Sequence, residues 1–547
     1  MAVRKSTSLG ITLALILYLL LSLTFLKLPG LQYDEVNFVN ASMGKADAQF
    51  VTWAPGLFGR RLPLMIMGYI GAVKSVLYAP IFKVFGTSAT TVRLPVVCIG
   101  LITLLTSYAL LRRMFGDLRI AGIELLLFAT DPTFVFGNKL DWGPVSLMLL
   151  LEVSSLYFMW RWMQEGKRYF LVIAGFSFGL GLYNKIIFAW YFAAFFIALL
   201  LFFRENIKQL LSWRALVWFL AAWLAGCFPL VGFNIRKHME TFKHQKVMTL
   251  PGMTTLKQRY ELFRGTLDAQ GVYFLVTRGQ VEDMPGSPKN GSSEKGDLLT
   301  RAIAGFSWVR RSPMPLALAG SLVLILILWT LGRLSKTREI LFLTTQLVII
   351  AAFICLTPEA NGAHHVLALY PFVFIVIAFA VCALGDWLGK SRTTASVVTG
   401  LCLSPLLLAQ LVVDARYLQS FKASGGVGYW SDAIYELASF ADKNPDKNFV
   451  LMEWGFSNQL MLLSNGRIRH EDFICDDGNL ESCMEPLFSQ PNAVTIFYAP
   501  PYGKPAVLDA YKEALARHHL QAKAQTFFQR DGRPVYLVYD SDKMIRQ

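Results

Sequence analysis

Two adjacent carboxylates, Asp34 and Glu35, follow the first apolar run of the chain in the segment Leu31-Gln-Tyr-Asp-Glu-Val-Asn-Phe. A carboxylate at a membrane surface can act as the general base that draws a proton from an acceptor hydroxyl. Neighbouring residues of a helix point about 100° apart, so only one of the pair can meet a given substrate atom. The other would orient a helix or the acceptor. The alternative is structural, because acidic side chains stabilise a helix N-terminus.

A second group of charges lies where apolar runs begin or end. Lys139 and Asp141 flank the predicted start of a helix with Pro144 in its first turn, so Asp141 caps that helix, takes part in chemistry, or does both. Lys185 ends the turn Gly-Leu-Gly-Leu-Tyr-Asn-Lys, and Arg93 begins another apolar run. Either cation would stabilise a phosphate leaving group. A lysine between apolar runs can also simply extend its amine to the interface.

Three further polar residues stand out against their apolar surroundings. His364 and His365 close a short connection, and adjacent histidines do not share a helix face, so substrate hydrogen bonding is favoured over a metal pair. Glu152 lies well inside an apolar run, where a carboxylate is costly. We assign it no role.

The composition is that of a membrane protein. The 547 residues are 54% hydrophobic and only 16% charged, whereas soluble chains carry about a quarter charged residues. Apolar runs of about twenty residues are long enough to cross a bilayer. The first, 11–28, lacks a cleavage site after it and is read as an anchor. The net charge of +15 comes mainly from short connections and not from a nucleic-acid-binding stripe.

The positive charges orient the spans, because they gather in connections on the inner side. The apolar segment 64–85 contains Lys74, Pro80 and Lys83, and we predict helices lying on the membrane surface there. The connections 112–119, 161–168, 204–214, 333–338 and 390–392 are then basic and inside. The eleven predicted spans are 11–28, 91–111, 119–136, 144–162, 169–183, 187–203, 214–233, 313–331, 339–356, 366–388 and 393–412.

The predicted fold is mainly α: a polytopic transmembrane helical bundle, 1–413, with a soluble C-terminal α/β domain, 414–547, on the outer face. The outer face also holds a first loop, 29–90, and a second, 234–312, whose stretch 286–296 reads as flexible. In the C-terminal domain we predict strands at 448–453 and 493–498, helices at 431–443 and 505–519, and a hairpin of 523–528 with 535–539. Cys475 and Cys483 are predicted to form a disulfide in this domain.

Five motifs in order give the membrane part, about 1–412, a resemblance to the GT-C membrane glycosyltransferases, in the branch of protein O-mannosyltransferases and aminoarabinose (lipid A) transferases. The Asp34-Glu35 pair is similar to the acidic motif of that family. The other four are 85–95, Lys139-x-Asp141, Gly-Leu-Tyr-Asn-Lys185 and 365–371. The chain departs from the family pattern with Asn184 where Thr is usual and with Lys139 in place of Arg.

The resemblance implies transfer of a sugar, with inversion, from a polyprenyl-phosphate-linked donor to a hydroxyl acceptor on the outer face. No soluble nucleotide sugar and no nucleic acid takes part. The implied location is a bacterial inner membrane, with the active site facing the periplasm. No cofactor is predicted, and nothing in the sequence indicates a divalent metal, although one is possible. The acceptor remains open between lipid A, a polysaccharide, a glycolipid and a protein.

The resemblance also distributes roles. Asp34 is expected to be the base, because the first acidic residue has that role in the family, with Glu35 and Asp141 as further catalytic candidates. The remaining assignments are Lys139, Lys185 and Arg93 to the donor phosphate, with Asp141 holding Lys139, and His364, His365 and Tyr183 to substrate.

Two other functions remain open. A transporter or lipid flippase would place ionisable residues at mid-span, as Glu152 is. An O-antigen-type ligase would use a lipid diphosphate donor, but the acidic pair and the soluble domain are not expected there.

Overall fold

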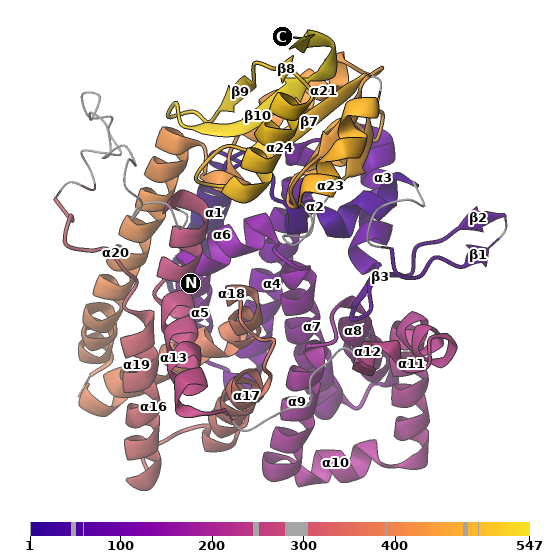
Figure 1. The fold of residues 1–547 in the computed structure, drawn as a ribbon. Helices are drawn as coiled ribbons and strands as arrows, with labels where there is room; N and C mark the ends of the chain where they lie inside the picture. The colour runs from indigo at the N-terminus through magenta and orange to yellow at the C-terminus, as the bar shows by residue number, and fades with distance from the viewer. Residues whose placement is uncertain are drawn as a thin grey trace.

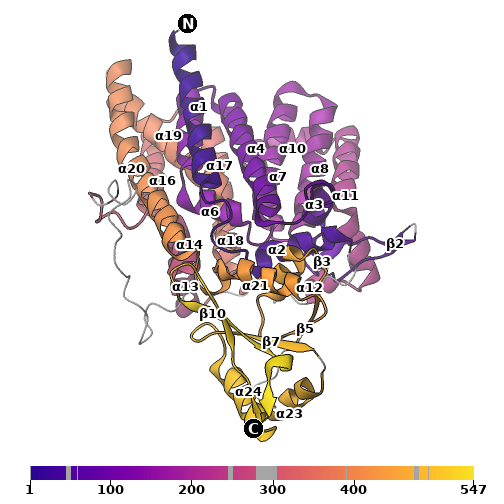
Figure 2. The ribbon, with the colours of Figure 1, turned by 90° about the horizontal axis from the view of Figure 1, so that it is seen from above.

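The computed structural model describes residues 2–44, 51–57, 59–243, 251–278, 303, 305–389, 391–473, 480–490 and 492–546. A bundle of long apolar helices carries a smaller α/β domain at one end, next to α2 (Tyr33–Asn40) and α3 (Val73–Phe85) (Figure 1). The turned view in Figure 2 shows the same domain beyond that end of the bundle. The predicted helical bundle with a C-terminal α/β domain is therefore confirmed.

A helix lies at each predicted span. They are α1 (Ala2–Leu23), α4 (Ala89–Phe115), α5 (Leu118–Ala129), α7 (Val145–Glu165), α8 (Arg168–Asn184), α9 (Phe188–Phe202), α11 (Trp213–Arg236), α16 (Met314–Thr330), α17 (Thr337–Leu356), α19 (Tyr370–Leu388) and α20 (Arg392–Ser424). Within the described residues, five helices are long and apolar enough to cross a membrane, or up to seven if each bent pair forms one span. Many of their apolar side chains are exposed, as a lipid-facing surface requires.

One predicted span, 119–136, is wrong as a single straight helix. The chain bends by 59° between α5 and α6 (Pro132–Leu140). Asp131 is the cause, because its carboxylate accepts the backbone N–H of Phe134 at 2.9 Å and starts a new helix with Pro132 in the first position. Helix α6 leads into a connection, 141–144, that carries Asp141 and Trp142.

The first outer loop differs from the predicted surface helices. Within the segment 64–85, residues 65–71 form a hairpin, β3 (Met65–Met67) with β4 (Ile70–Gly71), and the helix of this segment is α3. Trp53 explains the strand, because its backbone N–H donates to Met65 O at 3.2 Å and its carbonyl accepts from Met65 N at 3.1 Å. The loop also contains a 3-10 turn (Ala41–Met43), β1 (Gly56–Leu57) and β2 (Arg60–Arg61).

The other connections contain short helices. These are α10 (Arg204–Leu210), α12 (Glu240–Lys243), α13 (Met253–Leu267), α14 (Gln270–Tyr273), a π-helical turn (Phe274–Arg278), α18 (Ala363–Val366) and a 3-10 turn (Leu367–Leu369). The stretch 286–296, predicted to be flexible, lies outside the described residues.

The C-terminal domain contains a five-stranded sheet in the order β6-β5-β7-β10-β9. Strands β6 (Arg469–Asp472), β5 (Asn448–Leu451) and β7 (Ala493–Tyr498) are parallel, whereas β10 (Pro534–Asp540) is antiparallel to β7 and to β9 (Gln525–Phe528). The two predicted strands and the predicted hairpin are therefore confirmed. The strand pair β8–β11 and the helices complete it: β8 (Leu520–Gln521), β11 (Ile545–Arg546), α21 (Ala433–Lys443), α22 (Ser457–Leu463), α23 (Leu480–Met484) and α24 (Pro505–Arg517).

Two details concern the edges of this domain. The predicted boundary at 413/414 lies inside α20, which continues to Ser424 and ends at Gly425 in the left-handed region (φ 72°). Cys483 is disulfide-bonded, but its predicted partner Cys475 lies outside the described residues, so the pairing stays a prediction. Cys98, Cys227, Cys355, Cys382 and Cys402 are free.

Helix α2 is held between the bundle and the C-terminal domain. Asn40 donates to the carbonyl of Asn458, at the start of α22, at 3.2 Å. Gly30, just before α2, donates its N–H to Trp430 O at 2.7 Å. Apolar residues of α2, including Val36 and Val39, form one buried cluster with residues of α3, α4 and α22. The two carboxylates of α2 therefore have fixed directions.

Candidate active site

A cavity of about 1060 Å³ opens beside α2, and four of the predicted site residues line it: Asp34, Lys185, His364 and His365. Its walls come from the β3–β4 hairpin, the connections after α6 and α8, and helices α9 and α11. The segment 357–365 closes another side. Apolar side chains form most of the remaining lining, among them Trp190, Phe192, Trp223, Leu230 and Phe353.

Asp34 is half-buried in the first turn of α2 and faces this cavity. Gln32 caps the helix, with its side-chain oxygen accepting the N–H of Asp34 at 2.7 Å. The Asp34 carboxylate accepts the indole N–H of Trp142 at 3.0 Å. Burial raises the pKa of Asp34, and the hydrogen bonds of Trp142 and Gln32 and the charge of Lys185 offset only part of that rise. The carboxylate is therefore a stronger base than an exposed one.

Lys185 is the buried cation of the cavity. It is the C-cap residue that directly follows α8, and its backbone is extended. Its Nζ donates to the carbonyl of Gly143 at 2.8 Å. Gly143 has a φ of 82°, and a Cβ there would lie 3.0 Å from the Lys185 amine. Burial lowers the pKa of Lys185 to about 7, despite the nearby carboxylates of Asp141 and Asp34. An ammonium has three donors, so the amine can bind a further acceptor such as a phosphate oxygen.

His364 and His365 lie on the short helix α18 with ring centroids 4.0 Å apart. The Trp142 ring, which binds Asp34, also packs on His364 at 4.8 Å. Nδ1 of His365 accepts the N–H of Gly362 at 3.3 Å. The preceding segment is held by the buried Arg259 of α13, which donates to Thr357 O and Pro358 O and also to Ala360 O.

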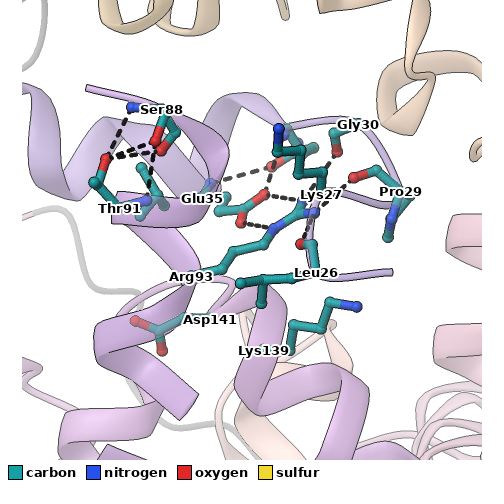
Figure 3. Close-up of polar contacts among 12 residues, drawn as sticks. Leu26, Lys27, Pro29, Gly30, Glu35, Ser88, Thr91, Arg93, Lys139 and Asp141 are labelled. Atoms are coloured by element: carbon teal, nitrogen blue, oxygen red, sulfur yellow. Dashed lines mark hydrogen bonds and ion pairs between the residues drawn. The ribbon is translucent and has the colours of Figure 1, made fainter. Parts of the chain in front are cut away.

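Glu35 and Arg93 do not reach the cavity, because they bind each other. Arg93 Nε and Nη2 donate to the two carboxylate oxygens of Glu35 at 2.6 and 2.9 Å, and both side chains are almost fully buried. The same guanidinium binds Pro29 O at 2.7 Å, Leu26 O at 3.0 Å and Gly30 O at 3.2 Å (Figure 3). The pair joins α2 to α4 and to the turn before α2. Neither the catalytic role predicted for Glu35 nor the phosphate contact predicted for Arg93 fits these contacts.

Lys139 and Asp141 also have partners other than those predicted. Lys139 is fully buried and donates to Phe25 O at 2.9 Å and Thr24 O at 3.3 Å, at the end of the first span. Asp141 instead forms a buried ion pair with Lys74 of α3 at 2.7 Å. Figure 3 shows the side chains of Lys139 and Asp141 pointing in different directions. The predicted Asp141–Lys139 contact is wrong, because the bend before α6 turns Lys139 towards the first span.

Asp141 and Tyr183 both hold backbone segments in place. Asp141 accepts the N–H of Ser146 at 2.7 Å, which confirms the predicted cap of the next helix. Tyr183 donates its hydroxyl to Leu64 O at 2.6 Å and accepts the N–H of Ala72 at 3.3 Å, so it fixes both ends of the β3–β4 hairpin. Its predicted contact with substrate does not fit this position.

The comparisons with known proteins agree with this arrangement. Residues 73–225 match the family model of the dolichyl-phosphate-mannose-protein mannosyltransferases. The fold matches ArnT from Cupriavidus metallidurans in the apo state, with a TM-score of 0.58, 14% identity and 98% of each chain covered. The structure of the same protein bound to undecaprenyl phosphate matches with a TM-score of 0.57, 14% identity and 97% of each chain covered.

The archaeal oligosaccharyltransferase AglB from Archaeoglobus fulgidus, in complex with an inhibitory peptide and a dolichol-phosphate, also matches. The TM-score is 0.52 at 15% identity, and the match covers 97% of this chain and 74% of AglB. No curated protein matches the sequence. The chain therefore shares the fold of ArnT and of AglB.

The family match and the shared fold confirm the resemblance predicted from the five motifs. Three positioning residues were not predicted. Trp142 is one of them, although it lies inside the motif that contains Lys139 and Asp141. In the sequence, Lys74 is marked only as an interruption of an apolar segment, and Arg259 carries no signal of its position. Among the described residues, no group of three His, Cys, Asp or Glu side chains is arranged to hold a metal ion.

Proposed function

We propose that this protein transfers a sugar from a polyprenyl-phosphate-linked donor to a hydroxyl acceptor, at the periplasmic face of a bacterial inner membrane. The observation that carries the proposal is the cavity shared by Asp34 and Lys185, a basic carboxylate and a buried cation beside an apolar wall. The family model and the fold of ArnT, which was solved with undecaprenyl phosphate, support the same class of donor.

The proposed reaction is a single displacement. The acceptor oxygen attacks the anomeric carbon, its proton passes to the Asp34 carboxylate, and the bond from that carbon to the phosphate oxygen breaks. The electron pair of the broken bond remains on the phosphate, whose added negative charge Lys185 stabilises. Attack opposite the leaving phosphate inverts the configuration of the sugar carbon. His364 and His365 line the same cavity and are proposed to bind the substrate.

The apolar wall suits the lipid part of the donor. Trp190, Phe192, Trp223 and Leu230 line the cavity from the membrane helices α9 and α11. Burying isoprenyl carbons against these side chains gains free energy in proportion to the area removed from water. Lys185 lies at the start of this wall. A donor whose phosphate bound Lys185 would therefore place its isoprenyl tail among the membrane helices.

Native mass spectrometry of the purified protein with added undecaprenyl phosphate tests this proposal. Lys185→Ala should reduce the bound fraction about tenfold or more, because a charge-assisted contact with phosphate is lost. Lys83→Ala, which removes an exposed lysine of α3, is the matched control and should bind as the wild type does. Equal binding by the Lys185 variant would contradict the proposed donor site.

The transporter alternative rested on Glu152, which is buried in α7. Both of its carboxylate oxygens lack a hydrogen-bond partner within the described part of the chain, but Glu152 does not line the cavity. The contacts therefore favour the transferase over the transporter.

A further inference from the structure

Two large aromatic side chains of the C-terminal domain are exposed beside α2. Trp454 is 46% exposed and Tyr429 is 42% exposed. The Trp454 ring packs on Tyr33, the first residue of α2, with centroids 4.6 Å apart, and meets Tyr429 at 6.2 Å with an interplanar angle of 68°. We call Tyr33, Tyr429 and Trp454 the aromatic shelf. Exposed apolar surface of this kind commonly marks a binding site.

Hydrogen bonds and ring contacts within the C-terminal domain hold the aromatic shelf in place. The Glu453 carboxylate accepts the backbone N–H of Tyr498 at 2.7 Å and that of Lys504, which joins two loops of the domain. Tyr429 donates its hydroxyl to Tyr502 O at 3.3 Å, and its ring meets that of Tyr498 edge-on at 4.8 Å. The exposed rings therefore lose little further conformational freedom when a ligand binds.

A glycine allows this close packing. Gly455 has a φ of 118°, and a Cβ there would lie 3.1 Å from the Tyr498 hydroxyl and 3.3 Å from the Tyr429 ring. Only glycine fits here, because it adopts a positive φ readily and has no Cβ to fill the small space. The position of Trp454, one residue earlier, is therefore defined by the backbone as well as by Tyr33.

Polar groups border the aromatic shelf. Ser457 hydrogen-bonds both Tyr33 and Asp472, and the charge of Asp472 is one reason why the pKa of Tyr33 is raised, after burial. Asp472 is half-buried, and burial raises the pKa of its carboxyl to about 6. A carboxylate next to flat aromatic surface is suited to a sugar ring, whose hydroxyls donate hydrogen bonds and whose C–H face packs on the rings.

The shelf also lies next to the proposed chemistry. Tyr33 and Asp34 are neighbours in α2, with Tyr33 directed to Trp454 and Asp34 to the cavity. Asp34 and Asp472 both affect the pKa of Tyr33, so two carboxylates lie close to this ring. Their charges favour an uncharged or amino sugar over a phosphorylated one.

We propose that the aromatic shelf binds a saccharide part of the acceptor and presents its hydroxyl to the cavity. This inference rests on the proposed function and adds that the acceptor carries sugar. It also gives the C-terminal domain a role in substrate binding.

Saturation-transfer NMR on the full detergent-solubilised chain tests this site directly, with cellobiose and di-N-acetylchitobiose as probes. Saturation should reach the ring C–H protons of at least one probe disaccharide. Trp454→Ala and Tyr429→Ala should each weaken the binding roughly fivefold or more, because an aromatic contact is lost. Trp454→Phe should retain much of it. Phe528→Ala removes a side chain that is 50% exposed on the same domain and should leave the binding unchanged.

Three outcomes would overturn the site. The first is no saturation transfer to either disaccharide, and the second is equal saturation transfer with Trp454→Ala and with the wild type. The third is stronger saturation transfer to a serine-containing tripeptide, which would point to a protein acceptor. Undecaprenyl phosphate binding, measured by native mass spectrometry in the same variants, separates the two proposals. Trp454→Ala should retain the lipid. Equal lipid binding by Lys185→Ala and the wild type would count only against the proposed donor site.

Discussion

Asp34 and Glu35 are neighbours in α2, yet their environments assign them different tasks. The Asp34 carboxylate faces the cavity and binds one indole N–H, whereas both oxygens of Glu35 bind Arg93. Burial leaves Asp34 with a raised pKa, which suits proton transfer from a hydroxyl. We therefore keep Asp34 as the proposed base and propose that Glu35 positions α2.

Replacing each carboxylate by its amide separates these tasks. Asp34→Asn should lower turnover at saturating donor by about 10²–10⁴-fold and leave the melting temperature near that of the wild type, because it removes only basicity. Glu35→Gln should mainly lower the melting temperature, since Arg93 would become a buried charge without its partner. Turnover per folded molecule and thermal unfolding in detergent measure both. A Glu35→Gln variant that melts normally but fails to turn over would reverse the roles.

The pH dependence of kcat/KM should report Asp34 and Lys185. The rate should rise with pH as Asp34, whose pKa is raised, loses its proton and becomes a base. It should fall again above about pH 7, because Lys185 has a pKa of about 7 and a neutral amine cannot stabilise the phosphate. Lys185→Arg should move the alkaline limb to higher pH, since arginine stays charged. An unchanged alkaline limb in that variant would exclude Lys185 as its source.

At the scale of elements, the site depends on contacts between segments that are far apart in the sequence. The Lys74–Asp141 pair joins α3 to the connection after α6, and Tyr183 joins the end of α8 to the β3–β4 hairpin. Arg259 of α13 fixes the segment before His364. These contacts bring the β3–β4 hairpin and α18 into the lining of one cavity.

The Lys74–Asp141 pair should be necessary for folding and not for chemistry. Lys74→Met should destabilise the protein by about 3–5 kcal/mol, because Asp141 would remain as a buried charge without a partner. Combining it with Asp141→Asn, which keeps the oxygen that caps Ser146, should recover much of that loss. Thermal unfolding of the single and double variants gives the coupling, with Lys83→Met as the exposed control. Additive losses would show that the pair is not coupled.

At the scale of the whole molecule, the C-terminal domain is part of the site's architecture. It clamps α2 through Asn458 and Trp430 and supplies the aromatic shelf. Asp34 of the cavity and Tyr33 of the shelf both belong to α2, and Figure 2 shows α2 at the end of the bundle next to that domain. The side of the membrane on which this end lies is a prediction from the positive-inside rule.

Reporter fusions test this orientation. A fusion after residue 338, in the first turn of α17 and at the end of the predicted basic connection 333–338, should report the inner side. A fusion after residue 425, where α20 ends, should report the outer side. The reason is the positive-inside bias of the short connections. A periplasmic and a cytoplasmic reporter, used in parallel, give opposite signals for each site. The same side for both fusions would reject the span assignment.

Local composition was sufficient for much of the fold. Apolar runs predicted a helix at each span, and the succession of strand-like and helix-like segments predicted β5, β7 and the β9–β10 hairpin, because both signals depend on neighbouring residues. The sequence also determined the candidates: Asp34, Lys185 and the histidine pair stand out as polar residues beside apolar runs. It did not predict the β3–β4 hairpin, where pairing with Trp53 outweighs an apolar helical pattern.

Only the tertiary structure decided which candidates share the cavity. Glu35 and Arg93 are 58 residues apart in the chain, and their ion pair removes both from the site. Lys139 and Lys185 look alike in sequence, yet the bend at Asp131 directs Lys139 to backbone carbonyls of the first span. Burial and ionic partners depend on how distant segments pack, and residue type and order along the chain do not contain that information.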